Sequence, residues 1–187
     1  VWDLEEHKLN YFQDQHRLYF SRFQLVRLDS KFIIEVAIVD DEKSIHHILE
    51  FGEEILNRKL SKSHPEFRVK FLHFYDVERL LVYLKDINGY GNSVNRNPDI
   101  ILSDLNMPMR SGIDLLNELE KRKIYDSIDK YIFSSYINES NILECKQYGA
   151  LDCFIKPIYL EGLVDLVLAL SSRHISNRAG LENLLDF

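Results

Sequence analysis

From about residue 32 onward, short apolar runs alternate with longer segments whose apolar residues recur every three or four positions. Ile33 to Val39 is apolar and rich in β-branched residues, except for Glu35, which is typical of a strand buried on both faces of a sheet. The next segment has apolar residues at helical spacing: Ile45, Ile48, Leu49, Ile55, Leu56 and Leu60. The pattern therefore predicts a strand followed by an amphipathic helix.

The same alternation repeats four more times along the chain. The further strands are predicted at Phe67 to Phe74, Ile100 to Ser103, Tyr131 to Phe133 and Cys153 to Ile155. The further helices are predicted at Val77 to Leu84, Ile113 to Leu119, Ile142 to Tyr148 and Leu160 to Leu170. Five such units in a row predict an α/β fold with a doubly wound, five-stranded parallel sheet and helices on both faces.

Two appendages flank this domain of residues 32–172. Residues 1–31 form an N-terminal arm, predicted as one long helix over about residues 1–30, with Asp3 as its cap. Its wide apolar stripe either packs on its own domain or pairs with a second copy: Trp2, Leu9, Phe12, Tyr19, Phe23 and Val26. Residues 173–187 are predicted as a C-terminal linker, leading to a further output domain, or as a short docking helix.

Composition narrows the class of protein. The 187 residues, 45% of them apolar, suffice for one domain with appendages, and the net charge of −7 argues against direct nucleic-acid binding. No run reaches the roughly 18 apolar residues of a membrane span and no signal peptide is recognisable, so a cytoplasmic protein without membrane contact is expected. Cys145 and Cys153 suggest neither a disulfide framework nor a zinc site.

Polar, reactive residues follow four of the predicted strands. They are Asp40 and Asp41, Asp104, Ser134 and Lys156. The carboxyl ends of parallel strands lie along one edge of the sheet, where α/β folds place their ligands. Three carboxylates, a hydroxyl and an ammonium gathered there suit a divalent cation and a phosphoryl group.

Each of these side chains has a role in such a site. Asp104 is the candidate nucleophile, because a carboxylate can hold a phosphoryl group as a mixed anhydride. Asp41, Asp104 and, through water, Asp40 are the candidate ligands of Mg²⁺ or Mn²⁺. Lys156 offsets phosphoryl charge and Ser134 donates a hydrogen bond to it. Taken singly, the Asp pair also suits a helix N-terminus, and a lysine before proline is usually a solvated surface residue.

These motifs resemble the receiver domain of two-component response regulators, the CheY-like family, over about residues 32–172. The resemblance rests on VDDEK, DLNMPMRSG and GALDCFIKP at three strand ends and on the steps from Asp104 to Ser134 and from Ser134 to Lys156. It implies the strand order 2-1-3-4-5, a metal-binding backbone carbonyl at Asn106 and a cis peptide bond between Lys156 and Pro157.

The resemblance also implies partners and a function. The chain would accept a phosphoryl group from a sensor histidine kinase or a phosphotransfer protein, changing conformation without acting as an enzyme on other substrates. If the chain pairs with a second copy, we expect the contact to form through the N-terminal helix or through the face of the fourth helix, fifth strand and fifth helix.

Three positions depart from the family pattern. Cys153 stands where receivers commonly have an aromatic switch residue, and Phe154 should point to the opposite face of the strand. Ser135 replaces a usual Ala or Gly beside the phosphoryl pocket and is followed by Tyr136. We expect the conformational switch to be routed differently and the phosphoryl group to be shielded from water.

Three other classes of protein share some of these features. A pseudo-receiver that only binds partners would need a broken acceptor site, and none of the five family positions is broken. A haloacid-dehalogenase-like phosphatase normally needs a second acid where the chain has Asn106. A flavodoxin-like cofactor binder would need a phosphate-cradling loop after the first strand, where Asp40 and Asp41 would repel phosphate.

Overall fold

The computed structural model describes residues 27–28, 31–89 and 97–184, and from residue 31 onward strands alternate with helices. The strands are β1 (Arg27–Leu28), β2 (Lys31–Val39), β3 (Phe67–Phe74), β4 (Ile100–Asp104), β5 (Asp129–Ser134) and β6 (Asp152–Ile155). The helices are α2 (Lys43–Leu60), α3 (Val77–Gly89), α4 (Gly112–Glu120), the 3-10 turn η2 (Lys123–Tyr125), α5 (Glu139–Gln147) and α6 (Leu160–Leu184).

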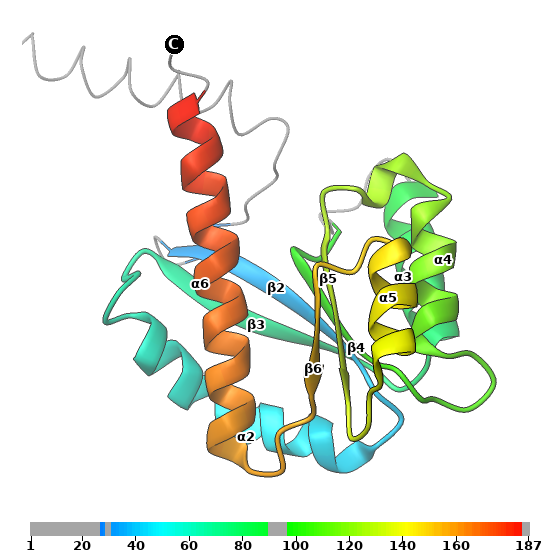
Figure 1. The fold of residues 1–187 in the computed structure, drawn as a ribbon. Coiled ribbons are helices and arrows are strands. Elements are labelled where there is room, and N and C mark those ends of the chain that lie inside the picture. Colours follow the sequence, from blue (N-terminus) through cyan, green and yellow to red (C-terminus); the bar gives the residue numbers. More distant parts are fainter. Residues whose placement is uncertain (1–26, 29–30, 90–96, 185–187) are drawn as a thin grey trace, which may run out of the picture.

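Five of these strands form the parallel sheet predicted from the sequence. Their order is β3-β2-β4-β5-β6, and each neighbouring pair is parallel (Figure 1). Counted along the chain from β2, this is the expected order 2-1-3-4-5. Parallel neighbouring strands are joined by crossover connections, which here contain helices, and these helices cover the two faces of the sheet.

The N-terminal arm differs from its prediction at its end. Residues Arg27–Leu28 form strand β1, which pairs antiparallel with the start of β2 in the register Arg27↔Phe32 and Leu28↔Lys31. The prediction that one helix continues to about residue 30 is therefore wrong. Strand β4 pairs with β2 only from Val36 onward, so backbone groups at the start of β2 need another partner, which β1 provides. The rest of the predicted helix, residues 1–26, lies outside the described residues and stays a prediction.

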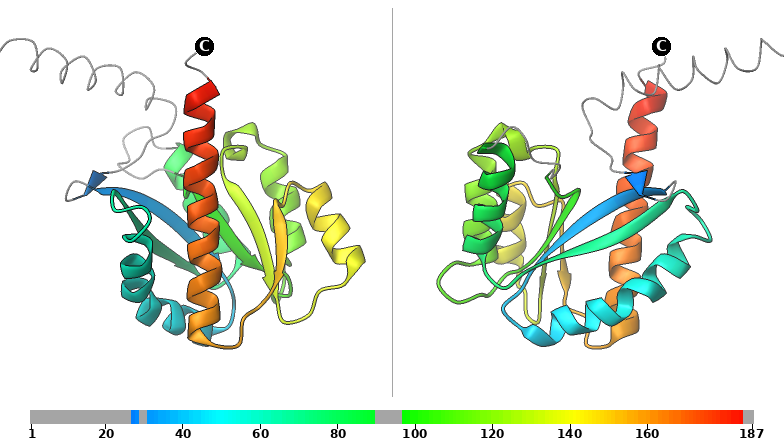
Figure 2. Two further views of the ribbon diagram at one scale, coloured as in Figure 1. Left: turned by 60° about the vertical axis from the view of Figure 1, so that its left-hand side comes forward. Right: turned by 180° about the vertical axis from the view of Figure 1, so that it is seen from behind.

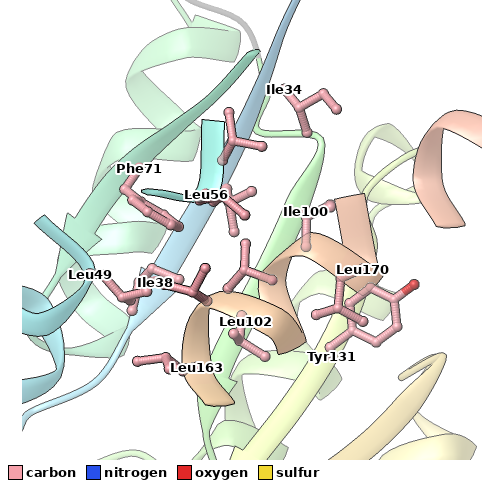
Figure 3. Close-up of a cluster of buried hydrophobic side chains, with 14 of the residues drawn as sticks. Ile34, Ile38, Leu49, Leu56, Phe71, Ile100, Leu102, Tyr131, Leu163 and Leu170 are labelled. Atoms are coloured by element: carbon pink, nitrogen blue, oxygen red, sulfur yellow. The ribbon is translucent and has the colours of Figure 1, made fainter. Parts of the chain in front are cut away.

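Two hydrophobic layers sandwich the sheet. Side chains of β2 alternate: Ile34, Val36 and Ile38 face α2 and α6, whereas Ala37 and Val39 face α3 and α4. Figure 2 shows α6 lying along one side of the sheet, and Figure 3 shows the interior of the layer beneath it, where β-strand residues meet Leu49, Leu56, Leu163 and Leu170 from the two helices. This two-sided burial explains why β2 reads as a nearly continuous apolar run.

Helix α6 is longer than the sequence predicts. A single helix runs from Leu160 to Leu184, where a helix ending at Leu170 and a separate segment from residue 173 were expected. The predicted helix end at Leu170 is wrong because the continuation has its own contacts: Ile175 joins the core, and Nδ1 of His174 lies 2.7 Å from Oδ2 of Asp129. A linker to a further output domain stays a prediction. No helix of the described residues is long and apolar enough to span a membrane.

Candidate functional site

Four strand ends bring the predicted site residues together. Asp40 and Asp41 follow β2, Asp104 and Ser134 are the last residues of β4 and β5, and Lys156 follows β6. Asp41 is exposed, and the other four are buried. The parallel register places these ends on the same edge of the sheet, as the sequence predicts.

Lys156 is the centre of the charge arrangement. Its Nζ lies 2.9 Å from Oδ2 of Asp40, 3.1 Å from Oδ2 of Asp104 and 3.8 Å from Oε1 of Glu42. It also lies 5.1 Å from the centre of the Phe133 ring. Burial acts to lower the pKa of Lys156, but hydrogen bonding and charge from Asp40 and Asp104 outweigh it and raise the pKa. The ammonium is therefore held charged beside the acids.

Asp40 is fixed at each of its polar groups. Its backbone N–H donates to the Phe74 carbonyl (3.0 Å), and its Oδ1 accepts from the Glu42 backbone N–H (2.9 Å). Nε2 of His46 lies 2.7 Å from its backbone carbonyl oxygen. Burial raises the pKa of the Asp40 carboxyl, against the lowering effect of Lys156. The Lys156 ammonium therefore does not fully offset the rise that burial causes in the pKa of Asp40.

The carboxylates fit a hard divalent cation. One oxygen each from Asp40, Asp41 and Asp104 lies within 4.8 Å of the other two. Oδ2 of Asp40 is buried, and among the described residues its partner is the Lys156 ammonium at 2.9 Å. Acceptor capacity therefore remains at a buried, negatively charged oxygen, and an oxygen-only donor set is the one that Mg²⁺ or Mn²⁺ takes.

Asn106, just after β4, connects the end of this strand to Ser134. Its Nδ2 donates to Oγ of Ser134 at 3.1 Å, and its backbone N–H points to Oδ1 of Asp104 at 3.4 Å. The backbone N–H of Lys156 donates to the Ser134 carbonyl at 2.8 Å, which joins the ends of β5 and β6. Metal binding by the Asn106 carbonyl stays a prediction.

The turn after Asp104 requires glycine at one position. Gly112 begins α4 and its N–H donates to the Leu105 carbonyl at 2.9 Å. A Cβ on this residue would collide with the carbonyl oxygen of Asp104. Ser111 caps the helix in a reciprocal arrangement with Asp114, and these hydrogen bonds lower the pKa of the Asp114 carboxyl. The helix start is thereby held against the end of β4.

One structural expectation at the site is wrong. The described residues contain no cis peptide bond, so the bond between Lys156 and Pro157 is trans rather than cis. Trans is the ordinary form of such bonds, favoured by about 0.5–1 kcal/mol. Lys156 contacts both Asp40 and Asp104 with this geometry.

The residues that depart from the family pattern lie around the site rather than in its charged centre. Ser135 and Tyr136 are exposed after β5. Cys153 packs into the cluster that contains Ile132 and Cys145, whereas Phe154 lies on the opposite face, with its ring centre 6.1 Å from that of Tyr131. The prediction that Cys153 and Phe154 face opposite ways is confirmed.

Three residues around Asp40 were not predicted as part of the site. Glu42 approaches Lys156, and His46 contacts both Asp40 and His73. The available signal was the position of His46 between Ile45 and Leu49 on the helix, where a polar residue facing the sheet must find partners. Its partners come from β2 and from β3, which local sequence does not indicate.

The chain is similar to known proteins of one family. The model of the response regulator receiver domain family matches residues 75–168. Among curated proteins, the chain is 33% identical over 86 residues to the "Two-component response regulator-like PRR73" of rice (Oryza sativa subsp. indica), covering 46% of this chain and 11% of that protein. It is 29% identical over 119 residues to the "Two-component response regulator ARR7" of Arabidopsis thaliana, covering 61% of this chain and 57% of that protein. The chain thus spans a small part to just over half of these relatives.

Solved structures share the fold. The phosphorylated cyanobacterial phytochrome response regulator RcpA matches with a TM-score of 0.58 and 24% identity, covering 76% of this chain and 94% of that one. The Mn²⁺-bound form of response regulator Rcp1 matches with a TM-score of 0.54 and 21% identity, covering 74% and 91%. Chemotaxis protein CheY4 of Vibrio cholerae matches with a TM-score of 0.53 and 19% identity, covering 72% and 96%.

Proposed function

Because this chain belongs to the response regulator receiver domain family of two-component signalling, we propose that it accepts a phosphoryl group on Asp104 with the aid of Mg²⁺ or Mn²⁺. The observation that carries the proposal is the position of the Lys156 ammonium, 2.9 Å from Asp40 and 3.1 Å from Asp104, beside a third carboxylate at Asp41. A buried acid with adjacent positive charge and spare oxygen ligands suits phosphoryl transfer, which depends mainly on positioning and charge neutralisation.

The transfer step conserves its atoms and charges. A carboxylate oxygen of Asp104 attacks the phosphorus of a phosphohistidine on the partner kinase or phosphotransfer protein, forming an O–P bond as the P–N bond breaks. The electron pair of the P–N bond returns to the imidazole. The other ring nitrogen carries a proton, so the departing imidazole is neutral. Asp40, Asp41 and Asp104 would hold Mg²⁺, which would supply positive charge to the phosphoryl oxygens.

The chain's own groups then stabilise the product. Lys156 exchanges part of its pairing with Asp104 for a phosphoryl oxygen. Ser134 is released from its acceptor role toward Asn106 and donates its hydroxyl hydrogen to the phosphoryl group. This rearrangement at the ends of β5 and β6 favours one state of a two-state equilibrium.

The output surface in this proposal is the face of α5, β6 and α6. Large apolar side chains are exposed on or beside these elements, as a partner-binding surface requires: Tyr136, Leu143, Ile155, Ile158 and Tyr159. Docking of a partner or of a second copy on this face would read the phosphorylation state. Dimerisation through the N-terminal arm is the other route that the sequence analysis leaves open.

The acceptor role is tested by intact mass. The chain is incubated with acetyl phosphate and Mg²⁺, beside Asp104→Asn and the control Asp114→Asn, which removes an exposed carboxylate on α4. We expect the wild type and the control to gain one phosphoryl group and Asp104→Asn to gain none. Absence of uptake by the wild type would favour a pseudo-receiver, and sustained hydrolysis of phosphoesters would favour the phosphatase alternative.

A further inference from the structure

A pair of imidazoles, one fully buried and one half-buried, lies beside Asp40 of the carboxylate cluster. His46, on the first turn of α2, is completely buried, and its Nε2 lies 2.7 Å from the carbonyl oxygen of Asp40. Its Nδ1 lies 2.8 Å from Nδ1 of His73 on β3. Tyr75 covers the His46 ring at a centre-to-centre distance of 4.4 Å. The imidazole is therefore held by three neighbours as well as by its own helix.

The partners define the direction of these hydrogen bonds. A carbonyl oxygen only accepts, so Nε2 of His46 carries the hydrogen that binds Asp40. In neutral His46, Nδ1 is then an acceptor, and Nδ1–H of His73 donates to it. Burial and the neighbouring His46 lower the pKa of His73, which favours its neutral form. The chain of donors thus runs from His73 through His46 to the backbone of Asp40.

The bonded carbonyl belongs to the peptide that joins the two adjacent acids. Asp40 is held by Phe74, Glu42 and Lys156 at its other polar groups, and its carbonyl is bonded by His46. Because a peptide unit is planar, fixing this oxygen also fixes the orientation of the Asp41 N–H and the direction in which the Asp41 chain continues. Asp41 itself is exposed, whereas Asp40 and Asp104 are buried.

We propose that His46 is a positioning residue for the metal site, orienting the Asp40–Asp41 peptide so that the Asp41 carboxylate converges with Asp40 and Asp104. The inference rests on the proposed function, since it assigns a further residue to the same site. His46 acts through the backbone of the ligands, without contacting the phosphoryl group and without proton transfer. Such supporting hydrogen bonds commonly change metal affinity 10- to 100-fold.

The test compares two amides of different length. The His46→Gln side chain reaches far enough to place an N–H near the position of Nε2, whereas the His46→Asn amide ends near Nδ1 and loses Asp40. Mg²⁺ affinity is measured by calorimetry, and the rate of phosphoryl uptake from acetyl phosphate is measured as a function of Mg²⁺. We expect His46→Asn to weaken Mg²⁺ binding about tenfold, with a maximal rate at saturating Mg²⁺ close to that of the wild type.

Rescue by the longer amide separates positioning from simple packing. We expect His46→Gln to bind Mg²⁺ within about threefold of the wild type. Equal affinities for the two variants, or a loss of maximal rate that Mg²⁺ does not restore, would overturn the inference. If His46→Asn does not fold, His73→Phe replaces it: this change removes the donor that orients His46, and an unchanged Mg²⁺ affinity would equally overturn the inference.

Failure of the proposed function can be distinguished from failure of the role proposed for His46. A wild-type chain that binds Mg²⁺ but takes up no phosphoryl group would contradict the acceptor role of Asp104, while the calorimetric comparison of the two amides would still decide the role of His46. A wild-type chain that binds no Mg²⁺ would overturn both.

Discussion

The ammonium of Lys156 lies 3.1 Å from the carboxylate of Asp104, although the two residues are 52 positions apart in the chain. The same ammonium contacts Asp40, so a single cation pairs with acids from two neighbouring strands. Because the site is buried, each of these charges affects the others more strongly than on the surface. Removing one of them tests how the site distributes its charge.

Replacing Lys156 should slow phosphoryl uptake by more than a loss of folding stability can explain. Lys156→Met removes the positive charge while keeping the aliphatic length, so we expect the rate of uptake from acetyl phosphate to fall roughly 100-fold. The matched control is Lys130→Met, which removes another buried lysine whose Nζ donates to the Tyr125 carbonyl at 3.2 Å, away from the carboxylates. Intact mass over time gives both rates, and similar losses in the two variants would contradict the assignment.

Mg²⁺ should stabilise the folded chain. The three carboxylates repel one another, so a bound cation favours the folded state, by about 2.7 kcal/mol at a concentration 100 times its dissociation constant. Thermal unfolding with Mg²⁺ and with EDTA measures the effect. We expect it to be largely lost in Asp41→Asn and kept in Asp114→Asn; stabilisation that survives in Asp41→Asn would place the cation elsewhere.

Ser135 should lengthen the life of the phosphorylated state. Its side chain is exposed next to Ser134, where we expect it to obstruct water approaching the phosphoryl group. Ser135→Ala should therefore lose the phosphoryl group faster, which is measured by intact mass after the donor is removed. An unchanged rate of dephosphorylation would refute this explanation, and Ser140→Ala, an exposed serine at the start of α5, serves as the control.

His73 should make stability depend on pH in the mildly acidic range. Burial lowers its pKa below the ordinary value of 6.5, so its stabilising contribution is present above 6.5 and is lost as the pH falls through the lowered value. Urea unfolding between about pH 8 and about pH 5 should show a smaller decrease for His73→Phe than for the wild type. The exposed His47→Gln should behave like the wild type, and equal slopes in all three would exclude His73 as the cause.

Asn57 should protect the edge of the sheet. From α2, its amide donates to the carbonyl of Val69 (3.0 Å) and accepts from the N–H of Val69 (2.7 Å), on the outer edge of β3. Oε2 of Glu53, one turn away, lies 3.4 Å from the Phe71 N–H. These side chains occupy backbone groups that would otherwise pair with another strand.

Asn57→Ala should therefore destabilise the fold and expose the edge. We expect a loss of roughly 1–3 kcal/mol in the free energy of unfolding, because it leaves backbone groups unpaired, together with concentration-dependent association. Chemical denaturation and light scattering measure these effects. Glu54→Ala, on the exposed side of α2, should change neither, and a monomeric, fully stable Asn57→Ala would show that water replaces the amide without cost.

Local patterns in the sequence were sufficient for most of the architecture. The apolar run of β2 and the helical spacing after it follow from burial on both faces of a sheet, and chirality then allows few topologies. Convergence of Asp40, Asp104 and Lys156 followed from the same reasoning, because the carboxyl ends of parallel strands share one edge. Strand β1 was missed because the apolar stripe of the arm indicated a helix up to about residue 30, whereas the structure pairs Arg27 with Phe32. The continuation of α6 was missed because its partner, Asp129, is distant in sequence.

The sequence by itself thus determined the order of strands and helices and the identity of the charged residues at the strand ends. Both follow from local information, because the spacing of apolar residues predicts each element and the residue type gives its chemistry. Only the tertiary structure decided that Lys156 pairs with both acids, that Lys156–Pro157 is trans, and that His46 links His73 to the Asp40 carbonyl. These relationships depend on distances and hydrogen-bond directions between segments, which are set by the packing of the whole domain.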